Sequence, residues 1–556
     1  MRPRYSVLPK ESVSILTRDC VRLDADVYRP DAAGKFPVLL MRQPYGRAIA
    51  STVVYAHPSW YAAHGFIVVI QDVRGRGTSE GEFQLFAHEV NDGFDTVEWA
   101  AHLPGSNGRV GMYGFSYQGM TQLFAAQAHP KALRAIAPAM VGYHPGEDWA
   151  YENGALLLQA GVGWAIQLAA ETARRQGDQV AFQALYQASR QLPVHDANPA
   201  CPEVLQRYAP DSFFHDWRQH PPDAPYWQSI TPQLQAVDLP MLHIGGWFDP
   251  YLRGDVRLYQ EMAARSQFPQ PLWIGPWGHL PWSQQVGGRN FGTAANSPID
   301  RLQIQWFAHW LRDEPAQLLN QPPVNFFEMG HNRWRAFDHW PEGDLQCWHF
   351  SSSGLAAMHS GDGKLLQVTV PLVDASPASA TATPSIDTWV HDPWRPVPSQ
   401  GGHAALPAGS FNRAAIDGRS DVLTYTSDPL PQTLAVAGHG EISLYCQCDR
   451  PSFDLSLTLS EVRPDGTVYN LTQGYGRFTG PPNVWQTHRV KLQPTCFSCA
   501  PGQALRVSIS AASFPAYTVN LGGAIAHPDS SLIDAQIITL SVNCNHPQSY
   551  LLLTSG

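Results

Sequence analysis

The sequence predicts an α/β domain with an inserted helical cap, followed by a C-terminal β-sandwich of the jelly-roll type. Short apolar runs alternate with helical periods through residues 1–144 and 236–320. Between them, residues 145–235 show long helical periods without a strand pattern. From residue 321 to 556, short runs of alternating apolar and polar residues are separated by turns. These changes of pattern indicate three domains.

The elements of the α/β part follow from local patterns. The chain opens with two β-like stretches joined by a tight turn, which predicts a hairpin. Continuous apolar runs are typical of strands covered on both faces of a parallel sheet. The expected strands are 13–16, 21–28, 38–42, 66–71, 110–113, 135–140, 241–245 and 271–275. The expected helices are 60–64, 89–101, one from 117 onward, 255–265 and 299–312.

The cap helices are expected at 156–175 and 180–190. Ligands bind at the C-terminal edge of open α/β sheets, and we expect the cap to cover that edge. Beyond the cap, antiparallel strands such as 442–446 and 455–462 indicate the β-sandwich. A Pro- and Gly-rich stretch between 392 and 414 lacks periodicity, and its length suggests a functional or wrapping connection.

Composition excludes several classes of function. The formal net charge is −10, and lysine occurs only at positions 10, 35, 131, 364 and 491, with no basic run. Binding to nucleic acid or to an anionic membrane is therefore not expected. The N-terminus lacks an apolar signal region, and no apolar stretch approaches the ~20 residues of a membrane span. We expect a soluble cytoplasmic protein, and a homo-oligomer is left open.

Eight cysteines in 556 residues are too few for a disulfide scaffold. The spacings Cys446-x-Cys448 and Cys496-x-x-Cys499 invite a zinc interpretation. Alternation along a strand, however, puts Cys446 and Cys448 on one face of a single strand. We favour free thiols and expect neither a metal nor another cofactor.

A serine stands where a predicted strand runs directly into a predicted helix. The segment is Gly114-Phe115-Ser116-Tyr117-Gln118-Gly119. A sharp strand-to-helix turn holds such a serine in a strained conformation with its hydroxyl facing a cleft, as in a nucleophile elbow. The usual G-x-S-x-G spacing is not met, because Gln118 precedes the second glycine. The alternative is an ordinary serine in a surface turn.

A serine nucleophile needs a histidine base and an acid that orients it, and in α/β-hydrolases these follow in the order serine, acid, histidine. Two strands after the cap end in Gly246-Trp247-Phe248-Asp249 and Pro276-Trp277-Gly278-His279. The sequence therefore predicts an α/β-hydrolase fold with Ser116, Asp249 and His279 as catalytic residues. Asp249 as a helix cap and His279 as an ordinary loop histidine are the alternatives. Asp238 and Asp255 are rival acids that do not directly end a strand, and His243 is interpreted as a core residue.

Together these segments resemble the cocaine esterase-like (CocE/NonD) hydrolases, a family grouped with X-Pro dipeptidyl-peptidases and α-amino-acid ester hydrolases. The resemblance covers nearly the whole chain. It is carried by residues 72–83, 114–119, 245–249 and 275–279, and by Asp421-Val-Leu and Pro464-Asp-Gly466. The later second glycine is usual in this family.

The resemblance implies a three-domain serine hydrolase with the same three catalytic residues. It also implies an oxyanion hole made by the Tyr45 hydroxyl and the backbone N–H of Tyr117. Independently, Tyr45 follows the strand 38–42, where α/β-hydrolases place an oxyanion donor. The alternative for Tyr45 is a turn residue after Pro44.

Five aromatic residues could line an apolar acyl pocket, and they could equally be packing residues. They are Trp149, Trp164, Trp247, Phe248 and Trp277. Family members that recognise an α-amino group place carboxylates directly after the catalytic aspartate, whereas here residues 250–253 are Pro-Tyr-Leu-Arg. Glu147, Asp148 and Glu152 could substitute only if the cap folds them inward.

The expected function is hydrolysis of a small-molecule carboxylic ester, or of an amide, through an acyl-enzyme without a cofactor. An X-Pro dipeptidyl-peptidase, an aminoacyl-ester hydrolase or a peptide acylase is the alternative within the class. The alternative of another class is a non-catalytic protein that binds carbohydrate or protein.

Overall fold

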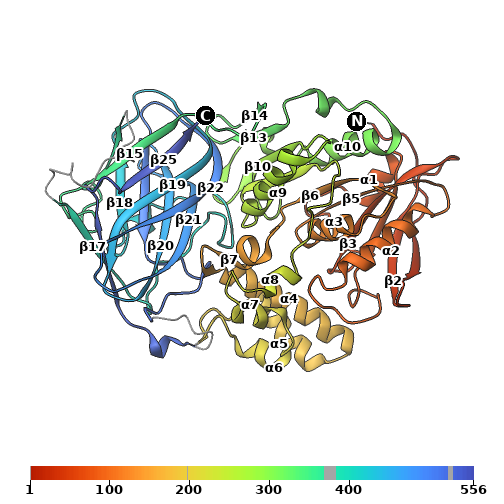
Figure 1. Ribbon diagram of the computed structural model, residues 1–556, viewed down its shortest axis with the longest axis horizontal. Helices are drawn as coiled ribbons and strands as arrows, with labels where there is room; N and C mark the ends of the chain where they lie inside the picture. Colours follow the sequence, from red (N-terminus) through yellow and green to blue (C-terminus); the bar gives the residue numbers. More distant parts are fainter. Residues whose placement is uncertain (1, 197, 369–383, 524–529) are drawn as a thin grey trace.

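The computed structural model describes residues 2–196, 198–368, 384–523 and 530–556. Most of the first 340 residues surround a ten-stranded sheet, and the later residues form an eleven-stranded one. In Figure 1 the α/β unit lies on the right, the strand-rich C-terminal unit on the left, and the cap helices lie below them. The expected fold class is confirmed.

The ten strands follow the order β1-β2-β4-β3-β5-β6-β9-β10-β13-β14. The outer hairpin of β1 and β2 is antiparallel, as expected, and the strands from β4 to β13 run parallel. The bounds are β1 Glu11–Leu16, β2 Arg22–Tyr28, β3 Phe36–Gln43, β4 Ile67–Asp72, β5 Ser106–Phe115, β6 Leu133–Ala139, β9 His243–Phe248 and β10 Leu272–Gly278. The predicted apolar runs form the buried centre of this sheet.

Helices cover this sheet and build the cap. Those of the α/β unit are α1 Pro58–Ala63, α2 Glu89–Ala101, α3 Tyr117–Gln127, α9 Leu252–Arg265 and α10 Ile299–Arg312. The cap contains α4 Leu158–Gln176, α5 Gln179–Arg190, α6 Glu203–Tyr208, α7 Phe213–Gln219 and α8 Tyr226–Ser229. It begins with a π-helical turn, Pro145–Ala150, and a hairpin of β7 Tyr151–Glu152 and β8 Ala155–Leu156. These two-residue strands are too short to give a sequence pattern.

The α/β sheet continues past residue 320, where we expected its domain to end. β13 Val324–Glu328 pairs in parallel with β10, and β14 Arg333–Phe337 pairs with β13. All five residues of β13 are buried. The change in pattern after residue 320 therefore marks the last strands of the first sheet, not the start of the second. Two-residue strands β11 Gln285–Val286 and β12 Arg289–Asn290 form a separate hairpin.

The C-terminal unit consists almost entirely of strands, and its jelly-roll connectivity stays a prediction. Its strands are β15 Leu345–Ser351, β16 Lys364–Val368, β17 Ile386–His391, β18 Leu423–Ser427, β19 Leu434–Cys448, β20 Ser452–Val462, β21 Val468–Thr479, β22 Gln486–Cys499, β23 Ala504–Ser510, β24 Ile538–Asn543 and β25 Tyr550–Ser555. One short helix, α11, spans Ala414–Asp417.

Short 3-10 turns occur in both units, at Thr293–Ala295, Gln317–Asn320 and Leu532–Asp534.

All eight cysteines are free thiols. Burial raises the pKa of Cys448 to about 11 and that of Cys496 to about 12, so both thiols are neutral near pH 7. Within the described ranges, no group of three or more His, Cys, Asp or Glu side chains could hold a metal ion. No helix in the part of the chain with assigned structure is long and apolar enough to cross a membrane.

The Pro- and Gly-rich stretch 392–414 contacts all three parts of the molecule. His403 lies 2.7 Å from the carboxylate of Glu152 in the cap. Ser410 forms a bridge with Gly287 of the α/β unit, and Asn412 forms one with Tyr469 of the β unit. This stretch is therefore a wrapping connection.

Candidate active site

Ser116 lies at the turn between β5 and α3. Its backbone has φ 60° and ψ −127°, a conformation that a residue with a side chain rarely adopts. Gly119 lies against the neighbouring strand, where a Cβ atom would come within 2.3 Å of the Val141 side chain. Close packing of α3 on the sheet thus requires the second glycine at position 119. The backbone at Ser116 has the strained geometry expected of a nucleophile elbow.

Asp249 and His279 follow the adjacent parallel strands β9 and β10. The His279 Nδ1 and Asp249 Oδ2 atoms are 2.6 Å apart, and the backbone N–H of Tyr251 donates to Asp249 Oδ1 at 2.8 Å. Asp249 is completely buried, whereas about a quarter of the His279 side chain is exposed. The imidazole packs against Phe115, the residue before Ser116, with ring centroids 5.1 Å apart. The structure thus brings the predicted acid and base together beside the elbow.

The rival ionisable groups lie in other environments. Asp255 is buried and accepts from the backbone N–H of Val141 at 2.8 Å. Its burial, together with the nearby charge of Asp249, raises the pKa of Asp255 well above its usual value, which favours the neutral acid. Asp238 accepts from the Ser266 hydroxyl at 2.6 Å at an exposed position. Burial lowers the pKa of His243 to about 4, consistent with a core histidine.

Tyr45 lies in the turn after β3, with its hydroxyl beside the Ser116 and Trp164 side chains. The surrounding protein desolvates this hydroxyl and raises the pKa of Tyr45 to about 12, although contacts with Trp164 and Ser116 lower it. The Tyr117 hydroxyl donates to Glu89 Oε1 at 2.7 Å, which anchors the first residue of α3. A backbone N–H in the first turn of a helix has no intrahelical acceptor and can bind an anion. The Tyr45 hydroxyl therefore lies beside Ser116, and the Tyr117 N–H belongs to the next residue along the chain.

The pKa of Tyr45 leads to a prediction for alkaline pH. Because this pKa is raised from about 10 to about 12, the hydroxyl keeps its proton and remains a donor at pH ~10. We expect kcat/KM for a neutral ester to show no decline on the alkaline side up to pH ~10. The pH dependence of kcat/KM, corrected for spontaneous hydrolysis, tests this. A decline centred near pH 10 that disappears in Tyr45→Phe would contradict it.

Two of the five predicted pocket residues lie at the site. Trp149 and Trp164 of the cap stack with ring centroids 5.2 Å apart. Trp149 also packs against Tyr251 at 4.7 Å, and Tyr251 packs against His279 at 5.0 Å. A wall of aromatic rings therefore connects the cap to the histidine. We did not predict Tyr251 as a wall residue, although its position two residues after Asp249 placed it near the site.

For the other three aromatic residues the contacts favour the packing alternative over the pocket. The Trp247 indole donates to the carbonyl of Phe327 at 2.7 Å, and the Trp277 indole donates to that of Ala295 at 2.7 Å. Phe248 is 1% exposed within the same core. Side chains within a strand point to the two faces of a sheet, whereas the site lies at its edge. Ser116, Asp249 and His279 each follow the end of a strand.

The cap carboxylates are already paired with arginines. Glu147 and Asp148 contact Arg257 at 2.8 and 3.0 Å. Glu152 lies 2.9 Å from Arg253 and is almost completely buried. Burial raises the pKa of Glu152, but the charges of Arg253 and His403 outweigh it and bring it to about 2. Glu152 is therefore an ionised partner of neighbouring cations, and Glu147 and Asp148 are both engaged by Arg257.

Comparison with known proteins gives matches along nearly the whole chain. Residues 19–281 match the family described as X-Pro dipeptidyl-peptidase (S15 family), and residues 318–547 match the X-Pro dipeptidyl-peptidase C-terminal non-catalytic domain. The chain is 30% identical to the cocaine esterase of Rhodococcus sp. (strain MB1 Bresler), over 99% of this chain and 98% of that protein.

Two solved structures share the fold over nearly their full length. An aminopeptidase from the marine sediment archaeon Thaumarchaeota archaeon matches with a TM-score of 0.81 at 22% identity, covering 99% of this chain and 96% of that one. An α-amino acid ester hydrolase matches with a TM-score of 0.77 at 22% identity, covering 100% and 97%. At this identity the likeness concerns the fold.

Proposed function

Because the chain belongs to the cocaine esterase-like (CocE/NonD) family of serine hydrolases, we propose that it hydrolyses neutral carboxylic esters through an acyl-enzyme on Ser116. The protein is a hydrolase of ester or peptide bonds, as its relatives are. The observation that carries the assignment of residues is the contact of 2.6 Å between His279 and Asp249 beside the strained Ser116.

We assign each step of the proposed reaction to one of these groups. His279 accepts the Ser116 proton through Nε2, because Nδ1 is held by Asp249. The serine oxygen attacks the ester carbonyl, and the resulting oxyanion accepts hydrogen bonds from the Tyr45 hydroxyl and the Tyr117 N–H. His279 then protonates the leaving alcohol, and a water activated by the same histidine releases the acid. The carboxylate of Asp249 stabilises the imidazolium in both halves of the reaction.

A fluorophosphonate probe tests this proposal, because only an activated serine reacts with it quickly. We expect rapid stoichiometric labelling of the wild-type protein and none of Ser116→Ala. Hydrolysis of a panel of p-nitrophenyl esters should disappear in the same variant. Slow labelling that is equal in both proteins would instead support a non-catalytic binding protein.

The arginines around the cap carboxylates support a preference for neutral acyl groups. A buried ammonium group needs an unengaged carboxylate, since an unpaired buried charge is heavily penalised. Glu152 and Asp148 are engaged by Arg253 and Arg257. No carboxylate occurs among residues 250–253. The geometry therefore supports an esterase without recognition of an α-amino group.

We therefore expect a neutral ester to be hydrolysed with at least about tenfold higher kcat/KM than its α-amino analogue, or ~1.4 kcal/mol of transition-state discrimination. The two substrates should share one leaving group and be compared at a pH where the amine is charged. A tenfold preference for the amine would favour the aminoacyl-ester hydrolase or X-Pro dipeptidyl-peptidase alternative. The next variants would then be at Glu147, Asp148 and Glu152.

The free state of all eight thiols supports a cytoplasmic location, which we propose for this protein.

A further inference from the structure

The turn that carries Tyr45 is held in place by polar side chains from two directions. It comprises residues 43–47 and has no regular secondary structure beyond the end of β3. We propose that Arg47 and Gln118 are positioning residues that fix the Tyr45 hydroxyl relative to Ser116. This inference rests on the proposed function, because it assigns these residues a role in the oxyanion hole.

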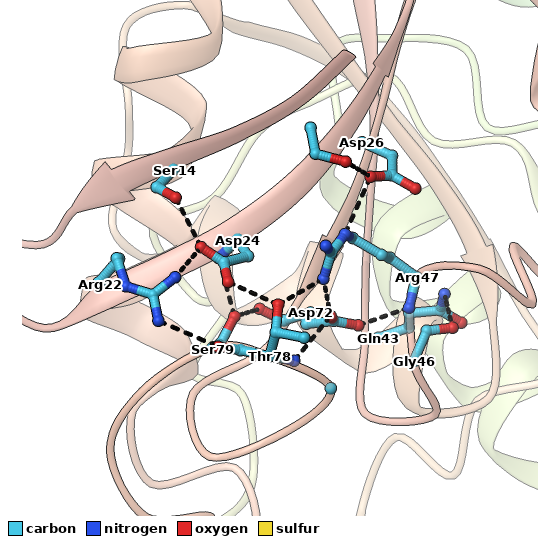
Figure 2. A network of polar contacts seen from close by, with 12 residues as sticks. Ser14, Arg22, Asp24, Asp26, Gln43, Gly46, Arg47, Asp72, Thr78 and Ser79 are labelled. Carbon is cyan, nitrogen blue, oxygen red and sulfur yellow. Dashed lines mark hydrogen bonds and ion pairs between the residues drawn. The ribbon is translucent and has the colours of Figure 1, made fainter. Parts of the chain in front are cut away.

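On one side, Arg47 is bound by two buried carboxylates, as Figure 2 shows. Its backbone N–H donates to Asp72 Oδ1 at 2.5 Å, and its Nη1 donates to Asp72 Oδ2 at 2.7 Å. Its Nε donates to Asp26 Oδ1 at 2.9 Å. Asp72 ends β4, directly beside Gln43 at the end of β3. The ion pair therefore attaches the turn, through both backbone and side chain, to the edge of the central sheet.

The segment after Asp72 is folded around its carboxylate. The backbone N–H of Thr78 donates to Asp72 Oδ2 at 3.3 Å, and the Ser79 hydroxyl donates to the Asp72 carbonyl at 2.8 Å (Figure 2). At Gly77, which has φ +53°, a Cβ atom would lie only 1.9 Å from Asp72 Oδ2. Residues 72–79, part of the segment that carries the family resemblance, thus encase the carboxylate that holds Arg47.

On the other side, a line of hydrogen bonds connects the turn to the nucleophile elbow. The backbone N–H of Phe115 donates to Gln118 Oε1 at 3.3 Å. Gln118 Nε2 donates to Gln43 Oε1 at 3.2 Å, and Gln43 Nε2 donates to the carbonyl of Gly46 at 3.0 Å. Both glutamines are completely buried. Gln118 occupies the position where the usual elbow spacing has its second glycine, so this departure supplies the connecting amide.

The connection matters because the two oxyanion donors belong to separate segments. The Tyr45 hydroxyl comes from the turn, whereas the Tyr117 N–H comes from the elbow. Their separation must fit one oxyanion to within about 0.5 Å, and a 1 Å displacement can cost ~100-fold in rate. Gln118 spans the two segments, and Arg47 prevents the turn from moving away. Neither side chain needs to touch the substrate.

Gln118→Met and Gln122→Met form a matched pair for the test. Gln122 lies one helical turn later in α3, is equally buried, and bonds backbone groups of Gly114, Gln118 and Ala137. We expect Gln118→Met to lower kcat about 10- to 100-fold with KM within about twofold, since the oxyanion forms only in the transition state. Gln122→Met should lower kcat less than about threefold at a comparable loss in Tm.

A double-mutant cycle with Tyr45→Phe separates positioning from general damage to the structure. Once the Tyr45 hydroxyl is absent, Gln118→Met should lower kcat by less than about twofold further. Arg47→Lys keeps the positive charge but cannot bond Asp26 and Asp72 with the fixed geometry of a guanidinium group. Its effect on kcat should show the same coupling to Tyr45→Phe. An equal loss in both backgrounds, or an equal loss of kcat for Gln118→Met and Gln122→Met, would overturn the inference.

Failure of this inference can be told apart from failure of the proposed function. If Ser116→Ala retains activity and probe labelling, the assignment of the nucleophile fails. If Ser116→Ala is inactive while Gln118→Met and Tyr45→Phe combine independently, only the positioning role fails.

Discussion

Ser116→Ala is expected to lower kcat by about 10⁶, or ~8 kcal/mol of transition-state stabilisation, because the three catalytic residues act as one unit. The side chain is small and 5% exposed, so its truncation leaves little cavity. The strained backbone of the elbow is retained by alanine. Tm should therefore change by no more than a few degrees. Single-turnover and steady-state hydrolysis of a p-nitrophenyl ester, with thermal unfolding, test this.

The double variant with His279→Ala provides the control for this prediction. When the nucleophile is already missing, loss of the base should lower kcat by less than about threefold further. The remaining rate comes from binding and from the oxyanion hole. A Ser116→Ala protein that keeps more than about a thousandth of the wild-type kcat would show that another group is the nucleophile.

The sequence patterns located the α/β unit and most of its elements because burial and periodicity are local properties. The limits of α2 and α10 agree with the predicted ones, since their amphipathic patterns end sharply at Ala101 and Arg312. The first sheet continues beyond the domain boundary that we predicted at residue 320. The sequence pattern of β13 indicates only a short strand. Its pairing with β10 shows to which sheet it belongs.

In the candidate site, too, local patterns predict some residues, whereas others depend on long-range contacts. Ser116, Asp249 and His279 could be predicted because each follows a strand that ends at one edge of the sheet. Trp247 lies two residues before Asp249, and Trp277 lies two residues before His279. Whether a strand side chain points into the core or toward the site depends on which face of the sheet the neighbouring elements cover. The roles proposed for Arg47 and Gln118 depend on contacts between segments far apart in sequence, such as Gln43 with Gln118. No local pattern encodes such contacts.

Asp249→Asn is expected to lower kcat by about 10⁴ while leaving the site geometry nearly unchanged. Asp249 Oδ1 accepts from the Tyr251 N–H, so the asparagine carbonyl is held there and its NH₂ faces His279 Nδ1. His279 must then present an unprotonated Nδ1, which leaves the proton on Nε2, where the Ser116 proton has to be accepted. Asp255→Asn is the matched control, because burial keeps Asp255 neutral and asparagine closely resembles the neutral acid. That variant should keep kcat within about tenfold, and a loss near 10⁴ there, with activity retained in Asp249→Asn, would make Asp255 the orienting acid.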